Sequence, residues 1–147
     1  MNKTIFIEIL NDILSTYSFN RRRNTWFYNT NELERIVKLV KSKYSDSYYI
    51  DYGFNLTKLD DNKLIMHIYN RLGSIDINEN RRIIELLDLS NSICSTNRII
   101  ELKYYINKYI IKYFENINSE NELVLYLKTK DNLNDIPLSV KKYFNIE

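Results

Sequence analysis

Residues 48–56, with the sequence YYIDYGFNL, alternate between apolar and mostly polar side chains. This period of two limits the fold more than any other feature, because successive side chains of a strand point to opposite faces of a sheet. An antiparallel sheet covered on one face only shows this pattern. We therefore expect a strand with a buried row and an outward row: Tyr48, Ile50, Tyr52, Phe54 and Leu56 in the first, Tyr49, Asp51, Gly53 and Asn55 in the second.

Short polar turns before and after this strand predict its neighbours. Residues 29–31, 45–47 and 59–62 each separate two runs that are rich in strand-forming residues. Connections this short join antiparallel strands, since parallel strands need a long crossover. The sequence thus predicts a four-stranded antiparallel meander over residues 25–29, 34–43, 48–57 and 63–72.

Helical spacing marks both ends of the chain. Apolar residues from Phe6 to Tyr17 recur every three or four positions, which predicts an amphipathic helix over residues 3–16. A longer stripe, from Ile99 to Ile117, predicts a helix over residues 96–115. Residues 74–93 are compatible with a helix, an edge strand or a packed loop.

Two further signals complete the predicted fold. Ser119 and Glu122 have the spacing of a capping box ahead of a short helix, and Pro137 could open a last one. The length of 147 residues is close to the commonest size of one domain. We expect a single α+β domain over residues 1–147, with an N-terminal helix, the four-stranded antiparallel meander, and C-terminal helices packed on one face of the sheet.

The composition limits the cellular setting more than the function. The chain has no Ala or Gln and is rich in Asn, Ile, Lys and Tyr, a bias that AT-rich codons explain. Its 21 basic and 19 acidic residues give a net charge of +2, too balanced to mark a nucleic-acid or membrane-surface protein. No window reaches the ~18 apolar residues of a membrane span, and no signal peptide is recognisable. With Cys94 as the single cysteine, no internal disulfide can form. We expect a cytoplasmic protein that does not contact membranes.

Few residue types needed for catalysis are present. One His and one Cys cannot build a structural zinc site, and neither Gly53 nor Gly73 begins a phosphate-binding loop. We therefore expect no catalytic, cofactor or metal site, and a protein that is not an enzyme. The alternative is an enzyme with His67 as a general base, although a packed or solvated strand histidine is the simpler interpretation. Cys94 and the Asp60-Asp61 pair are likewise expected to be an inert thiol and solvated turn carboxylates.

A second alternative comes from basic residues interleaved with aromatic ones. Residues 21–28 read RRRNTWFY, and the next predicted strand adds Arg35, Lys38, Lys41 and Lys43. Positive charge and aromatic rings on a sheet are typical of RNA-binding and single-strand-binding surfaces. Alternation divides the lysines between the two faces, and Glu32 and Glu34 dilute the charge. This arrangement favours a solvated sheet edge over a nucleic-acid surface.

Several short motifs follow one another in a definite order in residues 1–75. They are the basic and aromatic stretch at 21–28, Lys-Ser-Lys-Tyr at 41–44, Tyr-Ile-Asp-Tyr-Gly at 49–53 and Arg-Leu-Gly at 71–73. In this order and separation, the stretch resembles the bacterial family called domain of unknown function 4304. Members of that family that lie beside toxin genes look like candidate immunity proteins. The resemblance implies a protein that binds a cognate toxin.

These observations together favour a non-enzymatic protein-binding module, most concretely an immunity protein that neutralises a cognate bacterial toxin by steric occlusion. Charge complementarity would mainly speed and orient the encounter. The oligomeric state stays open, since an edge strand or the long helix could pair two chains. The expected partner-binding residues belong to the outward strand row and its neighbouring segments: Lys41, Lys43, Tyr44, Tyr49, Asp51 and Arg71.

Overall fold

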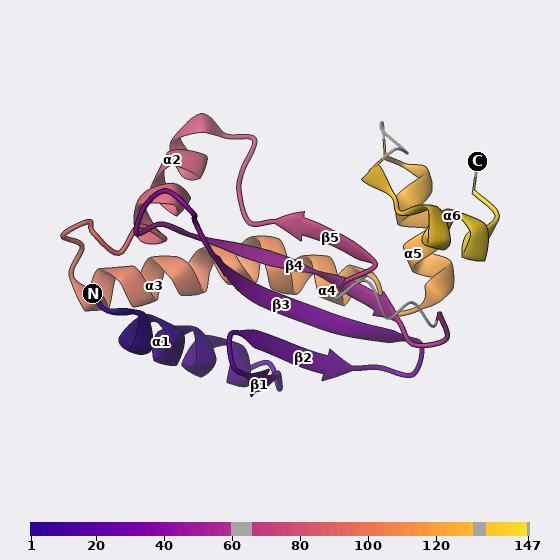
Figure 1. Ribbon diagram of the computed structural model, residues 1–147, viewed down its shortest axis with the longest axis horizontal. Coiled ribbons are helices and arrows are strands. Elements are labelled where there is room, and N and C mark those ends of the chain that lie inside the picture. Colours follow the sequence, from indigo (N-terminus) through magenta and orange to yellow (C-terminus); the bar gives the residue numbers. More distant parts are fainter. Residues whose placement is uncertain (60–65, 131–134, 147) are drawn as a thin grey trace.

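The computed structural model describes residues 1–59, 66–130 and 135–146 and shows an α+β fold (Figure 1). Its antiparallel sheet has the order β1-β2-β3-β4-β5, which confirms the meander. The expected number of four strands is wrong, because a short strand precedes the other four. The strands are β1 (Asn20–Arg22), β2 (Thr25–Asn29), β3 (Leu33–Lys41), β4 (Tyr48–Leu56) and β5 (Ile68–Arg71).

The boundaries of the last strand also differ from the expectation. The predicted fourth strand covered residues 63–72, whereas β5 comprises Ile68–Arg71. Residues 60–65, including Asp60 and Asp61, lie outside the described residues. The extra strand β1 has no apolar residue and is exposed along its whole length, so no alternation could reveal it.

The buried row of β4 is confirmed. All five of its members are buried, and β3 pairs Val37 with Tyr52 and Leu39 with Ile50 on the same face. Trp26 of β2, which is fully buried, continues this face toward the N-terminal helix, and its indole N–H donates to the Asn11 side chain (3.1 Å). One face of the sheet therefore carries most of the core.

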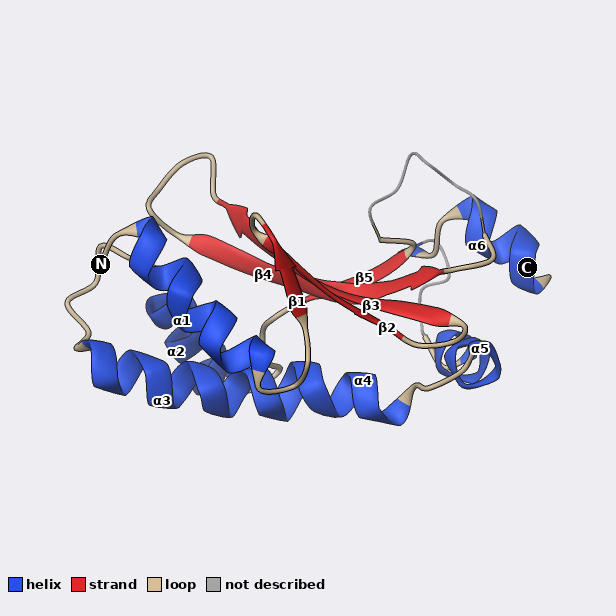
Figure 2. Cartoon of the chain, turned by 90° about the horizontal axis from the view of Figure 1, so that it is seen from below, coloured by secondary structure: helices blue, strands red, loops and turns tan. Residues whose placement is uncertain are grey.

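The helices cover this apolar face and one end of the sheet. Figure 2 shows α1, α2, α3 and α4 on one side of the strongly twisted strands, with α5 and α6 beyond one end. The predicted N-terminal helix and the long helix are confirmed, and residues 74–93 contain a helix. The bounds are α1 (Lys3–Ser15), α2 (Ile77–Leu86), α3 (Ser95–Tyr105), the π-helical segment η1 (Ile106–Ile111), α4 (Lys112–Asn116), α5 (Glu120–Lys128) and α6 (Leu138–Phe144).

Local signals explain where several helices begin. The Ser119 side chain accepts a hydrogen bond from the Glu122 N–H (3.1 Å), as a capping box requires. Asn2 caps α1 and Asp76 caps α2 in the same way, whereas Pro137 immediately precedes α6. These caps confirm the predicted start of α5 and the predicted role of Pro137.

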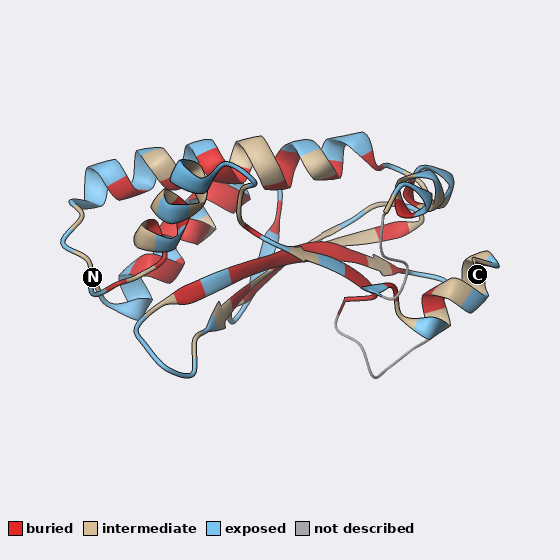
Figure 3. Ribbon diagram, turned by 90° about the horizontal axis from the view of Figure 1, so that it is seen from above, coloured by how far each residue is buried: buried red, intermediate tan, exposed pale blue. Residues whose placement is uncertain are grey.

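The long helix packs on the centre of the sheet through aromatic residues. Phe114 of α4 lies 5.3 Å from the Phe54 ring, and Tyr113 lies 5.3 Å from the Tyr52 ring, both measured between centroids. Edge-to-face pairs of this kind add to the free energy of apolar burial. Figure 3 shows the buried residues on the sides of the sheet and long helix that face each other.

A buried arginine fixes the segment after α2. Arg98 of α3 is fully buried and donates to the carbonyls of Leu86 and Asn91, the latter at 3.1 Å. In turn the Leu87 carbonyl accepts from the Tyr48 N–H (2.9 Å), which places the β3–β4 turn beside the end of α2. Desolvation lowers the pKa of Arg98, a consequence of its burial.

The contact between β4 and β5 leaves no room for a side chain at Gly53. A Cβ there would lie 1.8 Å from the Ile68 carbonyl oxygen and 2.6 Å from the Tyr69 Cα. We predict that Gly53→Ala lowers the free energy of unfolding by about 3 kcal/mol, because backbone atoms must move. Urea denaturation measures this loss. The control is Gly73→Ala, where the one close contact of the added Cβ is the Asn80 side-chain oxygen at 2.9 Å and the Arg71 carbonyl oxygen is at an ordinary 3.9 Å. An equal loss in both variants would contradict the prediction.

Candidate functional site

Large apolar side chains are exposed along one edge of the molecule. On β5 and α2 the exposed fractions are 58% for Tyr69, 74% for Ile77 and 56% for Ile84, and Ile75 between the two elements is fully exposed. Tyr49 of β4 is 38% exposed and lies beside Arg71 of β5, whose guanidinium is 4.1 Å from the centroid of the Tyr49 ring. A contiguous exposed apolar patch marks an interaction site, whereas single exposed apolar residues are normal. We call Tyr49, Tyr69, Arg71, Ile75, Ile77 and Ile84 the β5–α2 edge.

Arg71 is held rigidly at the centre of this edge. Its guanidinium donates to both Asp51 carboxylate oxygens, at 2.8 and 3.2 Å, and lies 4.1 Å from the centroid of the Tyr49 ring. The hydrogen bond to Asp51 raises the pKa of Arg71. Such a bidentate pair fixes the orientation of the arginine, and about half of the Arg71 side-chain surface stays exposed.

The same contact corrects one expectation. Asp51 was expected to face a partner, but it is only 7% exposed because Arg71, Tyr49 and the neighbouring strand cover it. Gly53 in the same row is also buried, and Asn55 is half-buried. Of the outward row of β4, only Tyr49 is freely accessible.

The sheet ends at β5 within the described part of the chain, so one side of this strand has no strand partner. The Leu72 N–H donates to the Ile50 carbonyl (2.8 Å), which fixes the phase of the β4–β5 ladder. Because antiparallel ladders alternate, the main-chain groups of Tyr69 and Arg71 point away from β4. Tyr69 and Arg71 therefore offer a partner both their side chains and their outward-pointing main-chain groups.

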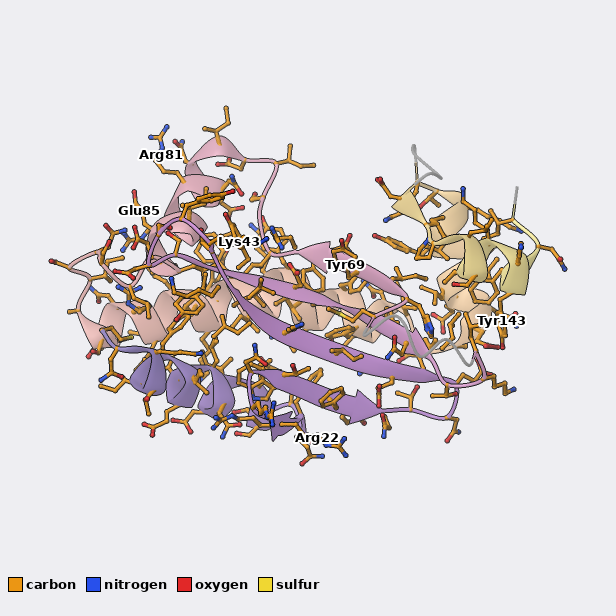
Figure 4. The ribbon with its side chains drawn as sticks, viewed as in Figure 1. Arg22, Lys43, Tyr69, Arg81, Glu85 and Tyr143 are labelled. Atoms are coloured by element: carbon orange, nitrogen blue, oxygen red, sulfur yellow. The ribbon has the colours of Figure 1, made fainter. Side chains whose placement is uncertain are left out.

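The remaining predicted residues lie at the end of β3, which is Lys41, and in the turn between β3 and β4. Lys43 is exposed and Tyr44 is 96% exposed, whereas the Lys41 ammonium donates to the Ser45 carbonyl within the turn and lies 4.0 Å from Asp46. The main-chain contacts with residues 87–89 hold this turn next to the end of α2. Figure 4 shows Lys43, Tyr69 and Arg81 in the half of the molecule that contains α2 and β5.

A polar network fixes α2 against the long helix. Glu79 of α2 accepts from Lys108 (2.8 Å), from Ser74 (3.0 Å) and from the Tyr109 hydroxyl. The hydrogen bonds from Lys108 and then Tyr109 lower the pKa of Glu79 to about 2, and the pKa of Lys108 is raised. Both donors belong to the π-helical segment η1, a feature that often occurs near functional sites. The network positions the isoleucines of α2.

Other candidate residues from the sequence lie elsewhere. His67 is 3% exposed, and its Nδ1 accepts a hydrogen bond from the Leu56 N–H (2.9 Å), so the ring joins the ends of β4 and β5. Cys94 is exposed and directly precedes α3. In the ranges 1–59, 66–130 and 135–146, no three His, Cys, Asp or Glu side chains are placed to hold a metal ion. None of the helices described there is long and apolar enough to cross a bilayer.

Sequence reasoning missed the isoleucine part of this edge. Residues 74–93 could not be assigned to one type of structure, so the exposed face of α2 was not visible. A helix over residues 77–86 places Ile77, Arg81 and Ile84 on one face, since positions four and seven apart are neighbours. The available sequence signal was a set of apolar residues at helical spacing on the solvent-facing side of a short helix.

The low pKa of Glu79 predicts a pH-dependent contribution to stability. Its value of about 2 lies below the ordinary 4.5, so the stabilisation is present above pH 4.5 and is lost as the pH falls toward 2. Glu79→Gln is expected to lower the urea midpoint at pH 7, by an amount that shrinks between pH 4.5 and 2. The exposed Glu8→Gln serves as the control. A difference between wild type and Glu79→Gln that does not change with pH would contradict the assignment.

With this geometry described, the chain was compared with known proteins. Searches against family models, curated proteins and solved structures found no match. The resemblance of residues 1–75 to the domain of unknown function 4304 family stays a prediction, and the fold and the β5–α2 edge are the basis for a function.

Proposed function

We propose that this chain is a non-enzymatic protein-binding module that docks its partner on the β5–α2 edge. The observation that carries the proposal is the exposure of Tyr69, Ile75, Ile77 and Ile84 on one edge of a rigid scaffold. In protein interfaces a few residues, often aromatic ones and arginine, supply most of the binding free energy. Arg71, already oriented by Asp51, loses little freedom on binding.

Charged groups of both signs surround the apolar residues of this edge. Lys43, Arg71 and Arg81 contribute positive groups, and neither Lys43 nor Arg81 forms an ion pair within the described residues. Asp76 and Glu85 contribute carboxylates. Complementary charge raises the association rate and fixes the register of a complex. An apolar centre with charges of both signs around it therefore fits a partner with an apolar patch bordered by complementary charges.

The partner we propose is a cognate protein toxin, which the chain neutralises by steric occlusion. The support is the family resemblance of residues 1–75 together with a surface that can bind a protein. A bound partner would cover α2, β5 and the β3–β4 turn. The main-chain contacts of Leu87 and Leu89 hold the turn beside the end of α2, and β5 is held by its pairing with β4. The chain would act by binding alone, and the blocked surface on the toxin would be its active site.

The direct test uses the protein encoded by the gene beside the one for this chain. We predict that co-expression of this chain protects cells from that protein, and that the two form a complex measurable by calorimetry. Tyr69→Ala is expected to weaken the complex about 30-fold, the effect of losing about 2 kcal/mol at an interface hot spot. Ile77→Asp, which puts a charge at the apolar centre, is expected to abolish protection.

The matched control is Tyr104→Ala on α3. Tyr104 is 55% exposed, close to the 58% of Tyr69, but it lies on a different element. We expect this variant to bind as tightly as the wild type. No protection by the wild-type chain, or equal losses for Tyr69→Ala and Tyr104→Ala, would contradict the proposal.

A further inference from the structure

Three consecutive arginines form the hairpin at the opposite edge of the sheet. Arg21 and Arg22 belong to β1, and Arg23 lies in the two-residue turn that leads to β2. All three are exposed, and none forms an ion pair within the ranges 1–59, 66–130 and 135–146. Figure 4 shows Arg22 on the side of the sheet away from Tyr69 and Arg81. This cluster is therefore separate from the β5–α2 edge.

Arg21 and Arg22 border a cavity of about 370 Å³ between β1, β2 and β3. Its volume falls within the range of ordinary ligand pockets. The walls include two guanidinium groups, two aromatic rings and one carboxylate, together with the polar side chains of Ser18, Asn20 and Asn29. These charged and aromatic groups belong to Arg21, Arg22, Phe27, Tyr28 and Glu34. The cavity thus combines a net positive charge with ring surfaces, a combination suited to an anion that carries flat groups.

Each arginine of this cluster is in a defined position. The Arg22 guanidinium lies 5.6 Å from the centroid of the Phe27 ring, within cation–π distance. The Arg21 Nε donates to the Arg23 carbonyl (2.6 Å), which holds that side chain along the hairpin. The remaining N–H groups of both guanidinium groups are available to a ligand, since each guanidinium has five donors.

The backbone at Arg23 is strained. Its φ of 57° lies in the left-handed region, at the first position of a two-residue hairpin turn where glycine is favoured. A residue with a large side chain at such a position costs stability, and strained residues of this kind gather at functional sites. An arginine that is unfavourable for folding at this position supports a role in binding.

From these four observations we propose that the β1–β2 hairpin binds single-stranded nucleic acid. Arginine contacts phosphate through paired N–H groups, and accessible aromatic rings stack on bases without regard to sequence. Phe27 and Tyr28 are half-buried, so part of each ring is accessible. The cavity is too small for a duplex but matches one nucleotide in size, with neighbouring phosphates in reach of Arg21, Arg22 and Arg23. An acidic peptide or a small phosphorylated metabolite would use the same guanidinium groups but would not stack on Phe27.

The test measures binding of a fluorescein-labelled ten-residue oligouridylate to the full chain by anisotropy, as a function of salt. We expect binding that weakens as salt rises. The Arg21→Gln/Arg22→Gln double variant is expected to reduce the slope of log K against log salt by about 1.4, or about 0.7 for each lost phosphate contact. Glu34→Gln, which removes the carboxylate from the cavity, is expected to tighten binding.

The matched control is Lys103→Gln/Lys112→Gln, which removes two positive charges from α3 and α4. It should leave the slope unchanged, whereas an equal effect of both double variants would show a nonspecific charge effect and overturn the proposal. Phe27→Leu should weaken binding, and pyrophosphate at equal phosphate concentration should compete poorly. Strong competition by pyrophosphate, or no effect of Phe27→Leu, would assign the cavity to a small phosphorylated ligand instead.

A further variant separates binding from folding. Arg23→Gly relieves the left-handed strain, so we expect a higher Tm together with weaker oligonucleotide binding. If Arg23→Gly is more stable and binds the oligonucleotide as tightly as the wild type, Arg23 is not part of the site. Absence of any binding by the wild-type chain at 50 mM salt would overturn the proposal as a whole, and it would leave the protein-docking function untouched.

Discussion

The rest of the structure depends on the contact between the apolar row of β4 and the aromatic end of the long helix. Phe54 and Tyr52 meet Phe114 and Tyr113 at centroid distances of 5.3 to 6.2 Å. Burial of these rings stabilises the packing of the sheet on the long helix. It also determines which face of each strand points away from the helix. Both edges of the sheet stay clear of this contact, so they can differ in chemistry without changing the core.

The two edges show how one small sheet can offer two kinds of surface. At β5 the exposed groups are apolar and aromatic around a single oriented arginine, the composition of a protein interface. At β1 they are three arginines without carboxylate partners in the described chain, beside a cavity lined by rings. Both edge strands are short, and charged or bulky side chains on them discourage the pairing of sheets between molecules. The side chains that discourage pairing of the sheet edges between molecules thus also determine what each edge can bind.

The sequence predicted the elements whose pattern follows from burial. The alternation of β4 and the helical stripe from Ile99 to Ile117 each reflect one face packed on the core. The structure confirms the buried row of β4 and the long helix, but Ile99 is exposed and Arg98 is fully buried. Strand β1 was not predicted, because it is exposed along its length and contains no alternating apolar residues. The burial of Asp51 could not be foreseen either, because it depends on the register with β5 and on the Arg71 side chain, contacts between residues 20 apart.

The candidate site was predictable only in its strand part. Tyr49, Arg71 and the β3–β4 turn were expected, whereas Ile75, Ile77 and Ile84 required knowledge that residues 77–86 are helical and lie beside the turn. Hydrogen exchange of the complex with the neighbouring gene's product tests the central claim most directly. We predict new protection of amides in residues 68–71 and 75–84, and none in residues 20–29. Protection confined to α3 and α4, or to the β1–β2 hairpin, would contradict the account.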